Sequence, residues 1–382
     1  MREQETDTAG QLIAILRASL RGESCRIDRT TDWTALVQLA RRHNLQHIAA
    51  ETALREENAA QLQPETLLSL QKIVLQSVAV SETQRYEAQR LLQRMEEAGL
   101  SVMPIKGLCT RERYPSQSFR SMGDLDFLYR PEQTGAVRAQ MRALGYTLRE
   151  GRKHDTYHLP PYVYAELHRQ LVASESAQAA YFSDIWSRAV PIPGTRHCFR
   201  MRAEDEYLFN LVHFAEHLRE GGAGIRFLMD VFVYEQTPLD RAYLNAELQR
   251  IGLSAFYENV RAVADSWFGD ASAALTPLQE QLATFVTAGG VFGNADNAAS
   301  LAVRDGRLAY IVHFCFPNYE SMCSMFPWLQ KAPALLPISW VVRGCSALCR
   351  RPDRVWRKFG QMLRGNRQRG RDLGTFLELC GL

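Results

Sequence analysis

Residues 100–171 are the part of the sequence that most constrains the fold, because they combine strand and helix patterns in a chain that is otherwise helical in pattern. The short apolar segments LSVMPIKG at 100–107 and GDLDFLY at 123–129 predict two strands. The segment PEQTGAVRAQMRALG at 131–145 predicts a helix that begins with a proline and ends with a glycine. Two further strands are predicted at 146–150 (YTLRE) and 162–171 (YVYAELHRQL). This order of elements predicts a small α/β unit.

Helical periodicity occupies the sequence on both sides of this unit. It covers residues 11–98, where the longest helix is expected to begin at Pro64 and to end before Gly99. From residue 203 onward the pattern is helical again, with segments near 224–236, 238–251, 253–269, 276–290 and 297–314. We therefore expect three regions, which are a helical region at 1–98, a core at 99–200 and a second helical region at 201–382.

The overall composition is typical of a soluble protein and names no partner. The 382 residues are 46% hydrophobic and 23% charged, with a formal net charge of +3. The eight cysteines form no Cys-x-x-Cys pair, and the segment MREQETDTAG at the start has no apolar signal core. The longest apolar run, at 332–342, has 11 residues and two prolines, whereas a membrane span needs about 20 residues. We expect a cytoplasmic protein with no transmembrane segment.

Two aspartates lie within the strand predicted at 123–129. Because side chains alternate along a strand, Asp124 and Asp126 point to one face while Leu125 and Phe127 point to the other. Two carboxylates about 5 Å apart repel each other by roughly 3 kcal/mol at an effective dielectric constant of 20. A divalent cation such as Mg²⁺, which prefers oxygen ligands, would offset this repulsion. The alternative is a strand end whose aspartates face water.

The neighbouring segments carry residues that suit phosphate and metal binding. Upstream, Lys106 and Gly107 end a predicted strand and begin a helix, where a glycine lets the backbone approach a phosphate. Arg120, four residues before Asp124, is a second candidate phosphate ligand. Downstream, the segment YVYAELHRQL places Glu166 and His168 on one face of a strand. Each residue alone has an ordinary alternative as a surface residue, but their order supports one phosphate-handling site.

This set of segments resembles a known family. The segments PIKGLCTRERYPSQSFRSMGDLDFLY and AELHRQL, separated by a helix ending in LGY, resemble the nucleotidyltransferase superfamily typified by DNA polymerase β. They are most similar to a largely uncharacterised bacterial branch of it, and HFAEHLREGGAGIRFLMDVFVY is similar to the helical portion of that branch. The resemblance is clearest over residues 95–235. It implies an α+β fold in which a small α/β nucleotidyltransferase core with a mixed sheet is flanked by N- and C-terminal helical regions.

The resemblance also implies an activity. It implies an enzyme that transfers a nucleoside monophosphate from a nucleoside triphosphate such as ATP to an acceptor and releases pyrophosphate. Asp124, Asp126 and Glu166 would be the catalytic residues and hold two Mg²⁺ or Mn²⁺ ions, and Glu166 would also help to deprotonate the acceptor hydroxyl. Lys106, Gly107 and Arg120 would bind the nucleotide. The superfamily has Gly-Ser where this chain has Lys106-Gly107, so the handling of the triphosphate differs here.

Other residues are candidates for the acceptor side of the site. These are His168, His213, Arg226 and Asp230. For Arg226 and Asp230, spaced i, i+4, the alternative is a local ion pair on a helix. Three histidine pairs share this spacing, namely His43/His47, His154/His158 and His213/His217. Such a spacing on a helix can hold zinc, but no pair has the glutamate of His-Glu-x-x-His, so we interpret the pairs as solvated or core histidines.

The C-terminal segment is strongly basic. Between Arg343 and Arg371 there are ten basic residues and one acidic residue. The tail at 350–372 therefore suits RNA or an anionic membrane surface, and its alternative is a solvated helix packed on the protein. The acceptor is left open among a small molecule, a peptide and RNA. Two rival functions also stay open: a catalytically degenerate binding or scaffold protein, and a toxin-like transferase acting on tRNA.

Overall fold

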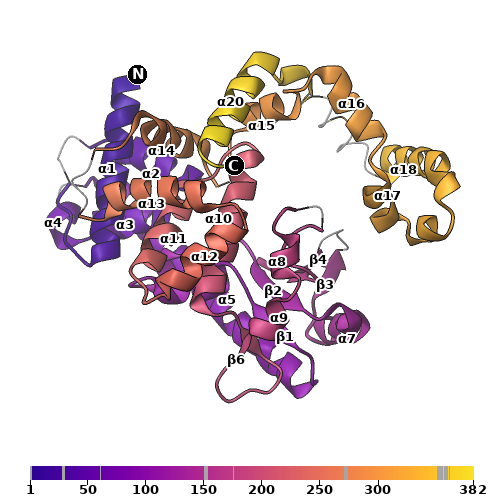
Figure 1. The fold of residues 1–382 in the computed structure, drawn as a ribbon. Coiled ribbons are helices and arrows are strands. Elements are labelled where there is room, and N and C mark those ends of the chain that lie inside the picture. Colours follow the sequence, from indigo (N-terminus) through magenta and orange to yellow (C-terminus); the bar gives the residue numbers. More distant parts are fainter. Residues whose placement is uncertain are drawn as a thin grey trace. The chain divides into compact units, whose positions relative to one another are not determined.

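The computed structural model describes residues 2–27, 31–60, 62–149, 154–174, 176–270, 274–291, 293–350, 356, 360 and 362–382 (Figure 1). The chain divides into two compact units. The first comprises Met1–Ala215 and Gly224–Val291, and the second comprises Glu216–Ala223 and Phe292–Leu382. The region boundaries predicted at 98/99 and 200/201 remain predictions.

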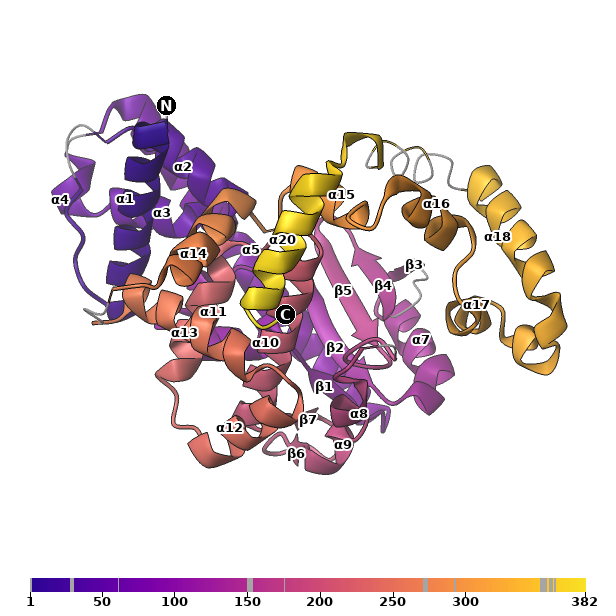
Figure 2. The same ribbon diagram turned by 45° about the horizontal axis from the view of Figure 1, so that its top comes forward.

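A five-stranded sheet forms the centre of the first unit. Its strands are β1 (Val102–Pro104), β2 (Leu125–Tyr129), β3 (Thr147–Arg149), β4 (His154–Leu159) and β5 (Val163–His168). The spatial order is β1-β2-β5-β4-β3, in which β2 and β5 run parallel and the other neighbours run antiparallel (Figure 2). The sheet is therefore mixed, and with the surrounding helices it confirms the expected α+β fold.

Strand β4 was not predicted from the sequence. Its inward-facing residues are Asp155 and Tyr157, both almost fully buried. Asp155 is neutralised there by ion pairs to Arg138 (2.9 Å) and Arg169 (2.5 Å). A buried charge that pairs with distant arginines interrupts the apolar alternation by which a strand is identified. His154 and His158 consequently lie on a strand, where their i, i+4 spacing is not the helical spacing that can hold zinc.

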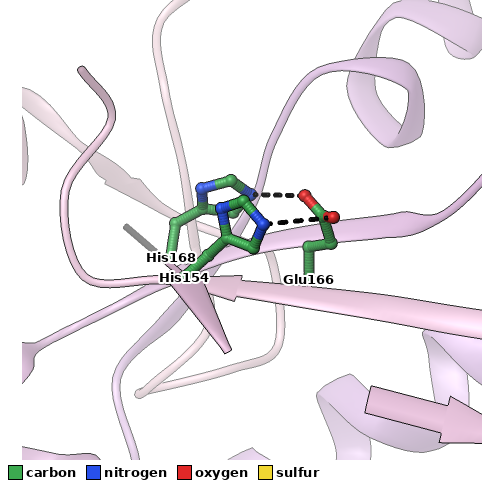
Figure 3. Close-up of side chains that lie close together, drawn as sticks. All are labelled: His154, Glu166 and His168. Carbon is green, nitrogen blue, oxygen red and sulfur yellow. Dashed lines mark ion pairs between the residues drawn. The ribbon is translucent and has the colours of Figure 1, made fainter. Parts of the chain in front are cut away.

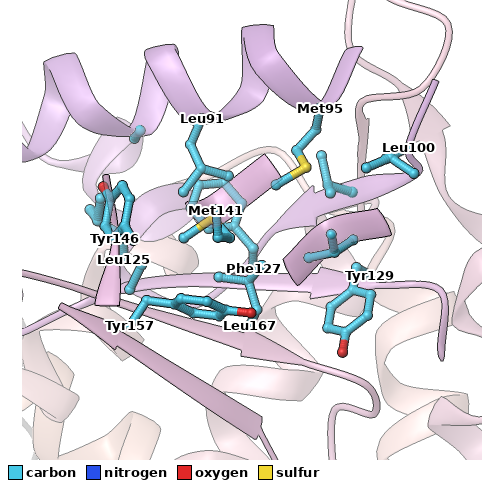
Figure 4. Close-up of a cluster of buried hydrophobic side chains, with 14 of the residues drawn as sticks. Leu91, Met95, Leu100, Leu125, Phe127, Tyr129, Met141, Tyr146, Tyr157 and Leu167 are labelled. Carbon is cyan, nitrogen blue, oxygen red and sulfur yellow. The ribbon is translucent and has the colours of Figure 1, made fainter. Parts of the chain in front are cut away.

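The hydrophobic core of the sheet lies on the face covered by helices α5 (Pro64–Glu97) and α7 (Thr134–Ala143) (Figure 4). As predicted, Pro64 begins the long helix, and its fixed φ suits the first helical turn. Leu125 and Phe127 of β2 are fully buried beneath these helices, and each such side chain stabilises the fold by about 1.5–3 kcal/mol. Because alternate residues face the opposite way, Asp124 and Asp126 are directed to the other face of the sheet.

The remaining elements of the first unit are mostly helical. Before the sheet lie α1 (Arg2–Arg21), α2 (Trp33–Arg42), α3 (Gln46–Ala53) and α4 (Glu56–Ala59). Short elements within and after it are α6 (Gly107–Thr110), α8 (Ala179–Phe182), α9 (Ile185–Arg188), β6 (Val190–Pro191) and β7 (Phe199–Arg200). The helices that follow are α10 (Ala203–Arg219), whose last turn belongs to the second unit, α11 (Ile225–Glu235), α12 (Arg241–Arg250), α13 (Ser254–Phe268) and α14 (Pro277–Gly289).

The early and late helices of the first unit pack on one another. The guanidinium of Arg17 on α1 donates to the carbonyl oxygens of Ser266 and Trp267 at the end of α13. His43, just after α2, accepts a hydrogen bond from the backbone N–H of Ile225 at Nδ1, and its Nε2 lies 3.1 Å from the carbonyl oxygen of Thr287. His43 and His47 are buried, which confirms their interpretation as core histidines.

The second unit is helical and contains α15 (Ala295–Ala302), α16 (Arg307–Cys315), α17 (Tyr319–Met325), α18 (Leu336–Arg350) and α20 (Arg367–Leu379). The single helix predicted at 297–314 was wrong, because the chain turns at Gly306, whose φ of 112° is open to glycine alone. Helix α20 packs against α15, and Gly370 leaves room there for the Ser300 backbone.

The predicted basic tail at 350–372 lies partly outside the described residues, which omit 351–355, 357–359 and 361. Within the tail, Met362 is buried and Leu363 is exposed. Among the helices that the structure describes, none is long and apolar enough to cross a membrane.

Candidate functional site

Three carboxylates meet on the open face of the sheet. In the parallel ladder of β2 and β5, Asp126 lies directly opposite Glu166, so their side chains emerge side by side. Asp124 immediately precedes β2 and is directed to the same face. Carboxylate oxygens of the three residues all lie within 4.8 Å of one another. The structure thus brings together the three residues that the sequence analysis assigned to metal binding.

Asp126 is the most strongly neutralised member of this cluster. Its Oδ1 receives the Lys106 ammonium at 2.6 Å and the His168 ring nitrogen Nε2 at 2.7 Å. Burial alone would raise the pKa of this carboxyl, but the charge of Lys106 and the hydrogen bond from His168 hold the pKa well below its usual range. Asp126 is therefore ionised at neutral pH.

Asp124 has the opposite electrostatic environment. Burial, followed by the negative charges of Asp126 and Glu166, raises its pKa to about 7. Each of these two negative charges affects the pKa of Asp124 more than the opposing positive charge of Lys106 does. Three hard oxygen donors with an excess of negative charge form the ligand set that Mg²⁺ or Mn²⁺ prefers, so these residues fit a divalent cation.

The Lys106-Gly107 turn has an unusual backbone. Lys106 has φ 52° and ψ −126°, a region that residues other than glycine rarely adopt. Gly107 begins the short helix α6, and a Cβ placed there would lie 2.8 Å from the Met122 side chain. A side chain at 107 would have to displace the flexible Met122 side chain, and the strained backbone at 106 carries a side chain that contacts the carboxylate cluster.

Arg120 and Asp230, both predicted to contact ligands, bind each other in the structure. The guanidinium of Arg120 makes two hydrogen bonds to the Asp230 carboxylate, at 2.7 and 2.8 Å, and both side chains are buried. Tyr114 donates a third hydrogen bond to the same carboxylate at 2.6 Å. Asp230 thus joins α11 to the loop before β2, and the local helix pair with Arg226 that we considered is replaced by this long-range pair.

The two other acceptor-side candidates lie in different surroundings. Arg226 donates to the backbone carbonyl of Ser121 at 3.1 Å, three residues from Asp124. Its positive charge lowers the pKa of Asp124, against the larger effect of burial, which places Arg226 within electrostatic reach of the cluster. His213 lies between the aromatic rings of Phe209 and Phe227, with ring centroids 6.5 and 5.7 Å away.

His154 is a residue of the site that the sequence analysis did not assign to it. Its Nε2 lies 3.2 Å from Glu166 Oε1, while His168 Nε2 lies 3.6 Å from Glu166 Oε2 (Figure 3). Burial would raise the pKa of Glu166, but the hydrogen bond with His154 brings it below its usual value. The only sequence signal was the alternation of His154, Thr156 and His158, which is visible once β4 is recognised as a strand.

A polar pocket of about 370 Å³ opens beside the loop that leads into β2. Its walls come from the α2–α3 connection, from α5 and from residues 118–122 of this loop. His47 and Gln46 line it, and within the described residues His47 Nε2 and Gln46 Oε1 are buried without a hydrogen-bond partner. Buried polar atoms without a hydrogen-bond partner favour a bound ligand or water molecule that would supply one.

The mixed sheet and the carboxylate cluster on its open face define a nucleotidyltransferase-type protein. Comparison with models of known families agrees, because residues 29–269 match a family described as uncharacterised nucleotidyltransferase. The chain belongs to this family and is a transferase. Searches of curated proteins and of solved structures gave no match.

Proposed function

We propose that the protein transfers a nucleoside monophosphate from a nucleoside triphosphate to a hydroxyl group of an acceptor and releases pyrophosphate. The observation that carries this proposal is the convergence of Asp124, Asp126 and Glu166 through the parallel pairing of β2 and β5. Nucleotidyl transfer uses divalent cations to hold the triphosphate next to the attacking oxygen, and such a cluster would hold those cations. Membership of the nucleotidyltransferase family supports the same reaction class.

Each residue of the cluster has a part in this reaction. Asp124, Asp126 and Glu166 would hold Mg²⁺ or Mn²⁺, which neutralises the triphosphate and activates the acceptor oxygen when bound. Lys106 supplies a positive charge at the edge of the cluster, where it can contact a phosphate oxygen. Glu166, ionised at neutral pH, would accept the proton of the acceptor hydroxyl. Asp124, with its pKa near 7, loses its remaining proton when a cation binds.

The polar pocket beside the β2 loop is the proposed acceptor site. It is lined by Ser121 and Met122, which precede Asp124 by three and two residues in the chain, so an occupant would contact the loop that leads to the carboxylates. Its lining combines amide, hydroxyl and imidazole groups with the apolar side chains of Ile73, Val80 and Met122. The pocket therefore supports an acceptor that has both hydrogen-bonding groups and an apolar part.

One observation favours the second candidate, a catalytically degenerate binding protein. The Lys106 ammonium occupies Asp126 Oδ1 at 2.6 Å, where a cation would otherwise bind. A chain that keeps the fold without turnover would be stabilised by such a permanent internal cation. The two functions differ in whether Mg²⁺ and a triphosphate bind together at the cluster.

Calorimetric titration of each nucleoside triphosphate, with and without Mg²⁺, separates the two functions. We expect Mg²⁺-dependent binding of at least one triphosphate to the unaltered protein and its loss in Asp124→Asn. Asp184→Asn is the matched control, because this carboxylate is largely exposed and lies outside the cluster. Transfer of the α-phosphate label into an extract fraction, with release of pyrophosphate, then identifies the acceptor. Absence of triphosphate binding to folded protein, or full transfer by Asp124→Asn, would overturn the proposal.

A further inference from the structure

Next to the three carboxylates lies a second group of potential metal ligands that contains nitrogen. His154 on β4 and His168 on β5 are direct partners in an antiparallel pair, and their ring centroids are 4.7 Å apart. Both Nε2 atoms turn toward the two oxygens of Glu166, as Figure 3 shows. One ligand atom from each of these three residues lies within 4.8 Å of the other two.

The spacing of these atoms fits a metal coordination shell. With metal–ligand bonds of about 2.0–2.1 Å, adjacent ligand atoms lie about 3.0 Å apart in an octahedral shell and about 3.3 Å apart in a tetrahedral one. The observed separations are 3.2 Å for His154 Nε2 to Glu166 Oε1 and 3.6 Å for His168 Nε2 to Glu166 Oε2. One ligand atom of each residue lies within 4.8 Å of the other two, so the three side chains must move closer together to bind one ion.

We propose that His154, Glu166 and His168 form a binding site for a divalent transition-metal ion such as Zn²⁺, Mn²⁺ or Fe²⁺. Two imidazole nitrogens and one carboxylate select such ions over Mg²⁺, which prefers oxygen alone. Glu166 is shared with the Asp124 and Asp126 group, so one carboxylate joins a nitrogen-rich position to an oxygen-rich position. The site is reachable from solvent, since the His154 side chain is 30% exposed.

Metal binding requires one rearrangement at His168. Its Nε2 now lies 2.7 Å from Asp126 Oδ1, and the tautomer that donates there carries its proton on Nε2. To bind a metal, this nitrogen must expose its lone pair, which exchange of the proton to Nδ1 through solvent achieves without a change of net charge. Asp126 then keeps Lys106 as a partner. The alternative is that His154 and Glu166 form an ordinary ion pair with no metal.

The transition-metal site is additional to the Mg²⁺ site of the proposed function. Binding of the ion depends only on the three side chains. Its part in catalysis, as one of two ions at a shared carboxylate, rests on the proposed nucleotidyl transfer. A transferase with this arrangement would respond to traces of transition metal that an all-carboxylate site does not retain.

Cobalt titration of the metal-stripped, full-length protein tests the site directly. Co²⁺ substitutes for Zn²⁺ and Mn²⁺, and its visible absorption reports nitrogen ligands. We expect one Co²⁺ per chain with such a spectrum, and we expect equimolar Zn²⁺ but not millimolar Mg²⁺ to displace it. His154→Ala should lose this spectrum and bind Co²⁺ at least about 100-fold more weakly, because one of three protein ligands is missing.

Two control variants make the test specific. His158→Ala removes a histidine from the same strand and face, about 13 Å along it, where the ring stacks on Tyr164; its Co²⁺ spectrum should be unchanged. Asp124→Asn should keep the nitrogen-ligand spectrum while losing Mg²⁺-dependent triphosphate binding. Circular dichroism establishes that each variant is folded.

The outcomes separate the two proposals. Equal Co²⁺ binding by the unaltered protein and His154→Ala, or no nitrogen-ligand spectrum in either, would overturn the transition-metal site and leave the ion pair. If every variant still bound the triphosphate, or if the unaltered protein bound none, only the proposed nucleotidyl transfer would be overturned. The cobalt spectrum does not depend on a nucleotide, so the metal site would be unaffected.

Discussion

Lys106 Nζ lies 2.6 Å from Asp126 Oδ1, and the residue that provides this ammonium has a backbone conformation normally reserved for glycine. The two facts belong together. A lysine at φ 52° costs on the order of 1–3 kcal/mol relative to a relaxed backbone, and the surrounding structure must supply that energy. The ion pair with a buried carboxylate at the centre of the site is the contact that this conformation makes possible.

Replacement of Lys106 separates the backbone cost from the charge. Lys106→Gly and Lys106→Ala both remove the ammonium, but only glycine relieves the strain. We expect Lys106→Gly to have a free energy of unfolding about 1 kcal/mol or more above that of Lys106→Ala. Urea unfolding of the two variants measures the difference. An alanine variant that is as stable as the glycine variant would show that the turn is not strained.

The buried pair of Arg120 and Asp230 should contribute to stability rather than to nucleotide binding. Asp230→Asn leaves Arg120 buried without its charge partner, which should lower the free energy of unfolding by about 3–5 kcal/mol. The double variant Arg120→Met, Asp230→Leu should be more stable than Asp230→Asn, since it leaves no unpaired charge. Thermal and urea unfolding measure both effects. If Arg120→Met kept full stability and lost triphosphate binding, the phosphate role predicted from the sequence would be correct instead.

A bulky side chain introduced on α5 tests whether the pocket beside the β2 loop binds the acceptor. Ser77 lines the pocket, so Ser77→Trp should block an acceptor while leaving Mg²⁺-dependent triphosphate binding intact. Label transfer to the acceptor should then fall at least about tenfold, because the reacting groups can no longer be held in position. Val78→Trp is the matched control on the neighbouring position, where the side chain is 47% exposed. If label transfer fell equally in both variants, or fell in neither, the acceptor would bind elsewhere.

His43 should make the protein less stable in mild acid. Burial, opposed by a hydrogen bond to the Thr287 carbonyl, lowers the pKa of His43 from 6.5 to about 4. Above pH 6.5 the imidazole is neutral in both the folded and the unfolded chain. As the pH falls from about 6.5 to about 4, only the unfolded chain binds the proton, so the free energy of unfolding falls by up to about 3 kcal/mol.

His43→Gln provides the comparison for this pH dependence. Glutamine can accept from the Ile225 N–H and donate to the Thr287 carbonyl, but it does not titrate. Urea unfolding at pH 7.5 and at pH 5 should therefore show a smaller loss of stability in the variant. His47, whose pKa is also lowered to about 4 by burial, should account for a remaining loss. Identical pH dependence in His43→Gln and the unaltered protein would contradict the assignment.

Local pattern was sufficient for much of the architecture. The face shared by Asp124 and Asp126 follows from the two-residue alternation of any strand. Helix α5 follows from apolar spacing, a proline at its start and a glycine after its end. Where the pattern was interrupted by a buried charge, as at Asp155 in β4, the element was missed. Where a glycine turned the chain within a segment of helical pattern, as at Gly306, one helix was predicted in place of two.

By itself, then, the sequence determined the order and kind of most elements, the shared face of Asp124 and Asp126, and the resemblance to nucleotidyltransferases. Only the tertiary structure decided which side chains meet. Asp126 meets Glu166 because β5 pairs with β2, and Arg120 meets Asp230 across 110 residues of chain. Periodicity depends on near neighbours along the chain, whereas strand pairing and buried ion pairs depend on which distant surfaces exclude water together.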